Sequence, residues 1–355
     1  MEQNSWRPSE HFRKPARLMS PIEEAGCWYP SEMAGNDAFI YRLNGAEIDE
    51  ITQAVEAVEA RGLEIKAITR AAFPLPRLSK VLSDIRAELL DGRGYALIRG
   101  LPLDGRSRFQ NVAAFWGLSS YFGQAFSQNA KGHLLGHVTN KGATLKSVNG
   151  RGYQSGEPLS FHADGCDLTS LFCLQTAKAG GTHRLCSSVA VYNEMLKRRP
   201  ELADALSFYF YMSRKGEIPK GETEPWFRLP VFSVQDGYFT ARGASNTLKR
   251  GHQLPGVPPL TPLQSEAIVL YQKLAAELAI DIVFQRGDMS YANSHVTLHG
   301  RSEFEDWPEP ERRRYLVRLW LRIDEGRRPL IPAFAKEIAR GITIDGVEPN
   351  AALEA

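Results

Sequence analysis

The stretch SFHADGCD, residues 160–167, places a histidine and a carboxylate two residues apart, His162 and Asp164. In an extended strand, residues two apart project from the same face of the sheet, so both side chains would point the same way. A neutral imidazole and a carboxylate on one face are half of a metal site. The same pair also arises when a histidine only hydrogen-bonds to a nearby acid, so a metal site needs a third ligand from elsewhere in the chain.

Two further histidines, His295 and His299, lie in the segment GDMSYANSHVTLHGRSEFED, residues 287–306. In a helical zinc pair with this spacing a glutamate follows the first histidine, and this chain has Val296 there. Polar and apolar residues alternate over 289–299, which predicts one strand with both histidines on its inner face. Two imidazoles and one carboxylate form the facial set that binds iron(II) and leaves three coordination positions open.

Two arginines interrupt the apolar segment ERRRYLVRLWLR, residues 311–322. Arg314 and Arg318 are four residues apart, so on a strand they share one face and both enter the interior. A buried guanidinium is costly unless it meets an anion, and a carboxylate fits its two parallel donors. The sequence therefore predicts either two small molecules that carry carboxylates, or one such ligand and one structural acid.

The elements that would position these residues follow from periodicity and from capping residues. Helices are expected at 46–60, 78–91 and 107–122, and a buried strand at 94–102. After residue 134, short apolar runs between glycine- and asparagine-containing turns are typical of β structure. A helical stretch at 189–206 should divide at Pro200, and Thr261 and Pro262 should open a helix over 261–281. Late strands are expected at 289–299 and 315–323.

Composition excludes several classes of protein. Lys plus Arg is 43 and Asp plus Glu is 41, which gives a net charge of +2 and no reason to expect nucleic acid as a partner. The sequence contains no run of 18 apolar residues and so does not predict a membrane span. The polar N-terminus lacks the apolar core of a signal peptide. Four cysteines without a CxxC pair are no disulfide framework, so we expect a reduced, cytoplasmic protein.

Over roughly residues 90–325, the chain resembles the taurine dioxygenase and clavaminate synthase family of iron(II)- and 2-oxoglutarate-dependent oxygenases. The pieces that carry the resemblance are FHADGCD, then AGG at 179–181 followed by SSVAVYNEML, then GDM and LHGR around His299, and RRYLVRLWLR. It implies a mainly β fold with flanking helices, a double-stranded β-helix (distorted jelly roll, cupin-like). We expect a single domain over 1–355, divided into an N-terminal arm (1–45), a helical flank with the first strands (46–133), a jelly-roll core with a helical insertion (134–325) and a C-terminal tail (326–355).

The resemblance also assigns roles to single residues. His162, Asp164 and His299 match the iron ligands, Arg314 matches the arginine that binds the distal carboxylate of 2-oxoglutarate, and Arg318 matches one that often binds an acidic substrate group. The family has a threonine about two residues after Gly-Gly that also contacts 2-oxoglutarate; here that contact is left open between Thr182 and His183. As further substrate contacts we assign His295, Tyr153 and Phe161, although the two aromatic residues would serve equally well in a core.

The resemblance implies three cofactors or cosubstrates: iron(II), 2-oxoglutarate and dioxygen. The expected reaction oxidises an unactivated C–H bond of a small anionic or amino-acid-like substrate and releases succinate and carbon dioxide. Asp164 argues against a halogenase, because related halogenases lack this carboxylate. Hydroxylation, desaturation, ring closure and bond cleavage stay open, as does a homo-oligomer. Two alternatives remain: a zinc hydrolase that uses the same three ligands, and a catalytically inactive jelly-roll binding protein.

Overall fold

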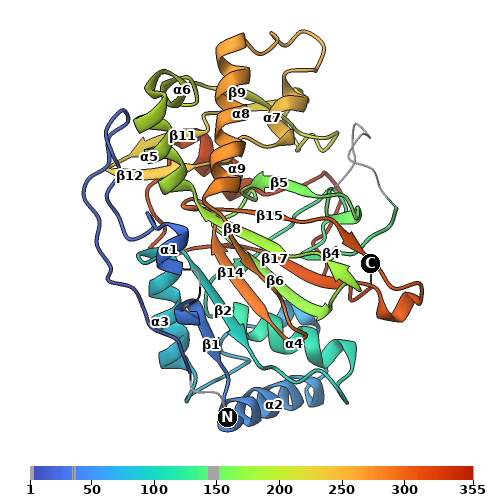
Figure 1. Cartoon of the computed structure of the whole chain (residues 1–355). Helices are drawn as coiled ribbons and strands as arrows, with labels where there is room; N and C mark the ends of the chain where they lie inside the picture. Colours follow the sequence, from blue (N-terminus) through green and yellow to red (C-terminus); the bar gives the residue numbers. More distant parts are fainter. Residues whose placement is uncertain (1–3, 34, 36, 143–151, 355) are drawn as a thin grey trace.

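The computed structural model describes residues 4–33, 35, 37–142 and 152–354, and in this part of the chain two main β-sheets face each other (Figure 1). The larger sheet has the order β1 (Ile40–Arg42), β2 (Tyr95–Arg99), β14 (Met289–Asn293), β6 (Leu168–Gln175), β17 (Tyr315–Arg322) and β3 (Gln124–Ala125), with β4 (Leu135–Val138) also paired to β17. The smaller sheet has the order β13 (Ile280–Ile282), β8 (His183–Ser187), β15 (Thr297–Arg301) and β5 (Leu159–His162). Three two-stranded pairs complete the β structure: β9 (Phe210–Ser213) with β10 (Trp226–Leu229), β11 (Phe232–Gln235) with β12 (Tyr238–Ala241), and β7 (Ala179–Gly180) with β16 (Phe304–Glu305).

Helices cover the outer face of each sheet (Figure 1). The larger sheet packs against α2 (Gly45–Ala60), α3 (Ser79–Leu90) and α4 (Arg108–Ser119). The smaller sheet packs against α5 (Ser188–Arg198), α6 (Pro200–Ala205) and α8 (Pro262–Glu277). The remaining helices are α1 (Pro30–Met33), α7 (Asn246–Gly251) and α9 (Pro332–Arg340), with short 3-10 helices at Asp37–Phe39, Ile65–Ala67, Gly152–Gln154 and Pro310–Arg312. None of the described helices is long and apolar enough to cross a membrane.

The helix boundaries confirm the capping signals of the sequence. Thr261 caps α8 by accepting a hydrogen bond from the backbone N–H of Gln264, whose side chain reaches back to Thr261, and Pro262 is the first residue of the helix. Pro200 opens α6 directly after α5, as expected. α2 and α4 have capping boxes of the same kind. These local signals fix where each helix starts, and therefore which side chains face the sheets.

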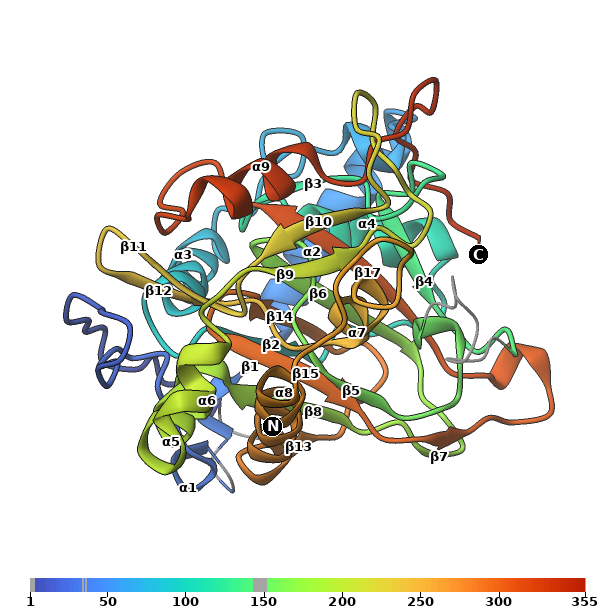
Figure 2. The same cartoon turned by 90° about the horizontal axis from the view of Figure 1, so that it is seen from above.

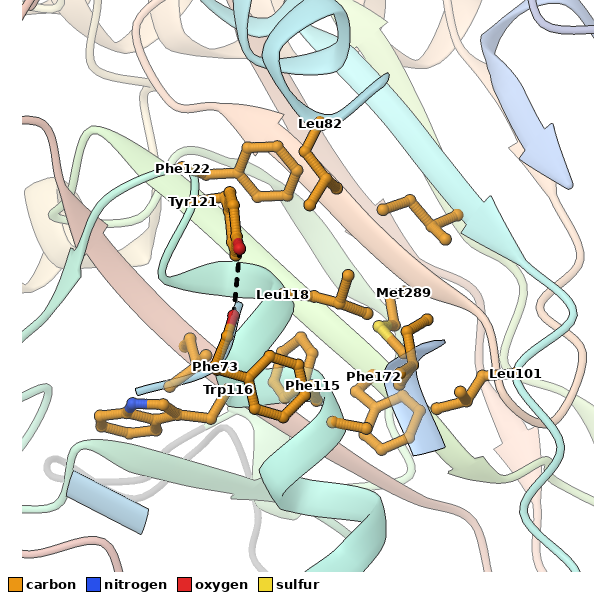
Figure 3. Packing of buried hydrophobic residues seen from close by; sticks show 14 of the residues in the cluster. Phe73, Leu82, Leu101, Phe115, Trp116, Leu118, Tyr121, Phe122, Phe172 and Met289 are labelled. Carbon is orange, nitrogen blue, oxygen red and sulfur yellow. Dashed lines mark hydrogen bonds between the residues drawn. The ribbon is translucent and has the colours of Figure 1, made fainter. Parts of the chain in front are cut away.

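Alternation along the strands separates an outer core from the space between the sheets. On β17, Val317, Leu319 and Leu321 pack toward the helices, whereas Arg318 and Trp320 face inward. The outer core contains aromatic residues from α4 and β6, with the rings of Phe115 and Phe172 5.1 Å apart (Figure 3). In the same cluster, the hydroxyl of Tyr121 donates a hydrogen bond to the carbonyl of Phe73 at 3.0 Å (Figure 3). Each fully buried side chain of this size contributes roughly 1.5–3 kcal/mol, so this layer fixes the larger sheet on its helices.

Two expectations about the fold need correction. The description as mainly β is too narrow, because the structure is mixed α/β with several sheets. The strand expected over 289–299 is two strands in different sheets, joined by a turn at 294–296 where the chain crosses between them. The side chain of Asn293 accepts from the N–H of His295 and so stabilises this turn. Within the segment called a tail, α9 forms a helix beside β10 (Figure 2).

Candidate active site

The three expected metal ligands converge where β5 and β15 pair. The antiparallel register places His299 directly opposite His162, with ring centroids 4.3 Å apart. Asp164 follows just beyond the end of β5, and its Oδ2 lies 3.9 Å from Nε2 of His299. One ligand atom from each residue lies within 4.8 Å of the other two. Small side-chain rotations therefore suffice for all three to reach one ion at about 2.0–2.2 Å.

Hydrogen bonds from neighbouring residues orient these ligands. Nδ1 of His162 lies 2.8 Å from the carbonyl oxygen of Ser160, and because a carbonyl only accepts, Nδ1 carries the proton and leaves Nε2 free to bind a metal. The hydroxyl of Thr169, on β6, donates to Oδ2 of Asp164 at 3.2 Å. Nη1 of Arg318 lies 3.3 Å from both carboxylate oxygens of Asp164. Both contacts come from neighbouring strands of the larger sheet, β6 and β17, so this sheet fixes the carboxylate.

The electrostatics of the site keep each ligand in the form that binds a metal. Burial lowers the pKa of His299 well below its usual value, and burial also lowers the pKa of His162, so both imidazoles stay neutral at physiological pH. Burial alone would raise the pKa of Asp164, but the positive charge of Arg318 lowers it far below its usual range. Two neutral imidazoles and an ionised carboxylate fit iron(II).

A cavity of about 260 Å³ opens beside the three ligands. Its wall includes Leu171 and Arg314 from the region of the larger sheet, and Phe334 and Glu337 from α9. Charged side chains are frequent in this wall: among the described residues, its cations are Arg214, Lys215, Arg242, Arg250, Arg301, Arg314 and Arg318, and its carboxylates are Asp164, Glu217 and Glu337. The cavity therefore has a surplus of positive charge before any ligand binds.

One end of the cavity joins Arg314, Arg301 and His183. Nη1 of each arginine and Nε2 of His183 are buried without a hydrogen-bond partner among the described residues. Burial lowers the pKa of Arg314 to about 10 and that of Arg301 to about 9, and the positive charge of Arg314 adds to the lowering at Arg301. Such unpaired buried donors are costly, and a bound carboxylate would satisfy them.

Gly181, the second glycine of the AGG motif, makes room for this end of the cavity. Gly181 has φ +72°, and a Cβ added there would lie 3.1 Å from Nε of Arg314. Glycine adopts this backbone conformation without strain, and its missing side chain allows the guanidinium to pass closely. The chain then enters β8, whose first residue, His183, stacks between Phe284 at 5.0 Å and His299 at 5.7 Å. Burial lowers the pKa of His183 to about 3, so its ring is neutral.

Arg318 already has protein partners. Besides the contacts with Asp164, its Nε donates to Oε1 of Gln128 at 2.8 Å, and its guanidinium lies 5.1 Å from the centre of the Trp320 ring. Gln128 in turn donates to the carbonyl oxygens of Leu134 and Arg318. The sequence left open whether Arg318 binds an anionic ligand or pairs with an acid of the protein. In the structure it pairs with an acid, and that acid is Asp164, an expected metal ligand.

Three other residues named from the sequence, His295, Phe161 and Thr182, lie elsewhere. His295 is not in the cavity wall: it occupies the turn between β14 and β15, with Nε2 2.8 Å from Oδ1 of Asp167, because the chain changes sheets there. Phe161 packs in the outer core with α5 and α8. Thr182 bonds through its backbone to Ser302 and does not line the cavity, whereas His183 does. The side chain of Tyr153 falls outside the described part of the structure.

Sequence reasoning missed several cationic residues of the cavity wall, and two of them, Arg301 and Arg242, lie at the cosubstrate end and at the metal-binding segment. Arg301 belongs to the quoted motif LHGR and has the same parity on β15 as His299, which was a usable signal. Arg242 follows β12, about 80 residues after the first ligands, and its Nη1 donates to the carbonyl oxygen of Asp164 at 2.8 Å. No local pattern in the sequence indicates this contact, because it depends on how the β11–β12 pair packs on the metal-binding segment.

Comparison with known proteins identifies the class. Residues 57–320 match the profile of the taurine catabolism dioxygenase TauD, TfdA family, and the chain belongs to this family. It is therefore an iron(II)- and 2-oxoglutarate-dependent dioxygenase. Among its curated relatives is the FR-33289 synthase of Streptomyces rubellomurinus, 28% identical over 321 residues, which cover 87% of this chain and 93% of the relative.

Solved structures of similar fold point the same way. An asparagine oxygenase in complex with Fe(II), 3-hydroxyasparagine and succinate has a TM-score of 0.62 and 17% identity, covering 86% of this chain and 99% of that chain. The non-haem iron oxygenase OrfP in complex with Fe and alpha-ketoglutaric acid has a TM-score of 0.60 and 18% identity, covering 80% and 94%. These likenesses concern the fold, since the identities are low.

Proposed function

We propose that the protein oxidises an unactivated C–H bond of a small, anionic or amino-acid-like molecule, with 2-oxoglutarate as cosubstrate and succinate and carbon dioxide as coproducts. The observation that carries the proposal is the convergence of His162, Asp164 and His299 beside a cavity whose far end holds Arg314 without an ion pair among the described residues. We also propose that residues 1–355 form one domain and that the two facing sheets form a double-stranded β-helix.

In this proposal His162, Asp164 and His299 hold the iron, and Arg314 binds the distal carboxylate of 2-oxoglutarate. The chemistry that bound iron and 2-oxoglutarate supply is the activation of dioxygen with oxidative decarboxylation of the 2-oxo acid. Arg301 and neutral His183 offer further donors at the same end of the cavity. A carboxylate there would neutralise one of two adjacent guanidinium charges, which supports a 2-oxo acid rather than a neutral cosubstrate.

Arg318 is assigned a positioning role. Its contacts with both oxygens of Asp164 and with Gln128 hold the ligand carboxylate toward the histidines and keep it ionised. A direct contact with the substrate remains compatible with its place in the cavity wall. Trp320 and residues of α9 form part of the cavity wall as well.

The test is succinate release under iron(II), 2-oxoglutarate and oxygen, measured for a panel of small sulfonates, phosphonates, carboxylates and amino acids. The proposal expects one member to raise succinate release well above the uncoupled background and to appear as an oxidised product. Hydrolysis of a panel member with zinc, without 2-oxoglutarate, would support the zinc hydrolase instead. Failure of 2-oxoglutarate to bind at all would support the inactive binding protein.

A further inference from the structure

We infer that the substrate carries a net negative charge, that Arg242 binds its anionic group, and that a free ammonium group excludes a molecule from the site. This inference rests on the proposed function, because it names the substrate class of the same cavity. It starts from the charges of the cavity wall: among the described residues, Arg242, Arg301 and Arg314 have no carboxylate partner, and the three carboxylates of the wall are Asp164, Glu217 and Glu337. The two positive charges of iron(II) and the two negative charges of 2-oxoglutarate cancel, so the surplus persists in the loaded enzyme.

The three carboxylates are already engaged. Asp164 accepts from Thr169 and Arg318 in addition to its place among the metal ligands. Glu337 pairs with both terminal nitrogens of Arg214, at 3.2 and 3.3 Å. Glu217 accepts from a backbone N–H, that of Ala130, at 2.7 Å. An ammonium group would therefore enter a positively charged cavity in which each described carboxylate is bound to another group, and this disfavours amino acids as substrates.

Of the three wall arginines without a carboxylate partner among the described residues, Arg242 is the one that bonds to the metal-binding segment. Its guanidinium makes one hydrogen bond, from Nη1 to the carbonyl of Asp164, and no carboxylate oxygen among the described residues lies within 4.0 Å of it. Arg314 and Arg301 lie at the cosubstrate end, and Arg318 is held by Asp164. A guanidinium with two terminal nitrogens binds phosphate, phosphonate, sulfonate or carboxylate oxygens in the same bidentate way.

The backbone holds Arg242 rigidly against the metal-binding segment. Its N–H donates to the carbonyl of Val231 at 2.7 Å, and the N–H of Ala241 donates to that of His295 at 2.9 Å. The next residue, Gly243, has φ +80°, and a Cβ there would lie 3.0 Å from the backbone nitrogen of Ala163. The guanidinium is thus fixed against the backbone carbonyl of Asp164, an expected iron ligand, so an anion bound to it would place its attached carbon chain beside the metal.

The experiment measures binding to the protein loaded anaerobically with iron(II) and 2-oxoglutarate, by calorimetry. The probes are methylphosphonate and methanesulfonate as anions, dimethyl sulfone as a neutral molecule of similar shape, and L-asparagine as a zwitterion. The variants are Arg242→Gln, which removes the charge, and Arg242→Lys, which keeps it without the forked donors. Arg313→Gln, an exposed arginine whose guanidinium donates to the carbonyl of Pro308, is the matched control.

The two anions should bind the parent protein more tightly than dimethyl sulfone or asparagine, and Arg242→Gln should weaken both by at least about 10-fold, the loss of one charge-assisted contact. Arg242→Lys should fall between the two, and Arg313→Gln should match the parent. Unchanged anion binding in Arg242→Gln, or asparagine binding as tightly as the anions, would overturn the inference. If Arg242→Gln no longer binds 2-oxoglutarate, the test passes to Arg242→Lys. Anion binding by Arg242→Lys as tight as that of the parent protein would then refute the assignment of Arg242. Failure of the parent to bind 2-oxoglutarate would instead refute the proposed function.

Discussion

Replacing Arg314 by methionine should have two separate effects, one on the affinity for 2-oxoglutarate and one on the stability of the ligand-free protein. The guanidinium is buried, and its Nη1 has no hydrogen-bond partner among the described residues. Burial lowers its pKa from 12.5 to about 10, which at 1.36 kcal/mol per pKa unit corresponds to about 3 kcal/mol held against the charged form. Methionine has a similar length and no charge, so the variant without ligand should be as stable as the parent or more stable.

The same substitution should weaken 2-oxoglutarate strongly. A charge-assisted bidentate contact is worth roughly 1.5–3 kcal/mol, and a bound carboxylate left beside methionine adds its own desolvation cost. We therefore expect the Kd for 2-oxoglutarate to rise by about 100-fold, limited by the donor that Arg301 still offers. Arg301→Met should have the smaller effect of the two, because its Nη2 already donates to the carbonyl oxygens of Ser155 and Glu157.

Two measurements test this pair of expectations. Calorimetry under anaerobic conditions with manganese(II) in place of iron gives the Kd, and thermal unfolding with and without 2-oxoglutarate gives the stability. The parent should gain in Tm on adding 2-oxoglutarate, and Arg314→Met should have a Tm at least as high without ligand but lose that gain. An unchanged Kd, or a large fall in stability of the ligand-free variant, would refute the assignment of Arg314.

Three further predictions follow. Asp164→Ala should abolish coupled turnover and weaken manganese(II) binding, measured by calorimetry, by at least about 10-fold. Unchanged manganese(II) affinity in this variant would show that Asp164 is not a metal ligand. Phe172→Ala should lower the free energy of unfolding by about 3–5 kcal/mol in a denaturant titration, because it empties the outer core beside Phe115, and a loss below about 1 kcal/mol would contradict that packing. Burial lowers the pKa of His295 despite Asp167, so the unfolded chain takes up a proton near pH 6.5 that the folded chain does not, and stability falls as the pH drops below that value. The difference in Tm between pH 7 and pH 5 should therefore be smaller in His295→Gln than in the parent protein. An equal difference in the variant and the parent would contradict this role of His295.

The sequence correctly predicts which side chains of β17 and of the residue before it face inward, because strand parity is local. Arg314 and Arg318 stand at even positions in an apolar run, and both enter the cavity wall in the structure. Capping residues are equally local, so Thr261 and Pro200 mark helix starts that the structure confirms. The pairing of His162 with His299 depends on strands that are far apart in sequence, and the family resemblance, not the spacing, indicated which of the two histidines takes part.

What could not be predicted depends on contacts between distant segments. His295 has the parity of His299 in the sequence, but the turn at 294–296 moves it into a different environment, beside Asp167. The helix α9 carries Phe334 and Glu337 into the cavity wall, although the sequence after residue 325 has no signal that relates it to the site. The partners of Arg318 and the position of Arg242 likewise follow from how the sheets and the β11–β12 pair pack together.

The most direct test of the central claim is an anaerobic crystal structure of the protein with iron(II) and 2-oxoglutarate, with anomalous data collected at the iron edge. The account predicts one iron peak at about 2.0–2.2 Å from His162, Asp164 and His299, and a 2-oxoglutarate molecule whose distal carboxylate contacts Arg314. An iron peak at another cluster, or 2-oxoglutarate bound away from Arg314, would contradict it.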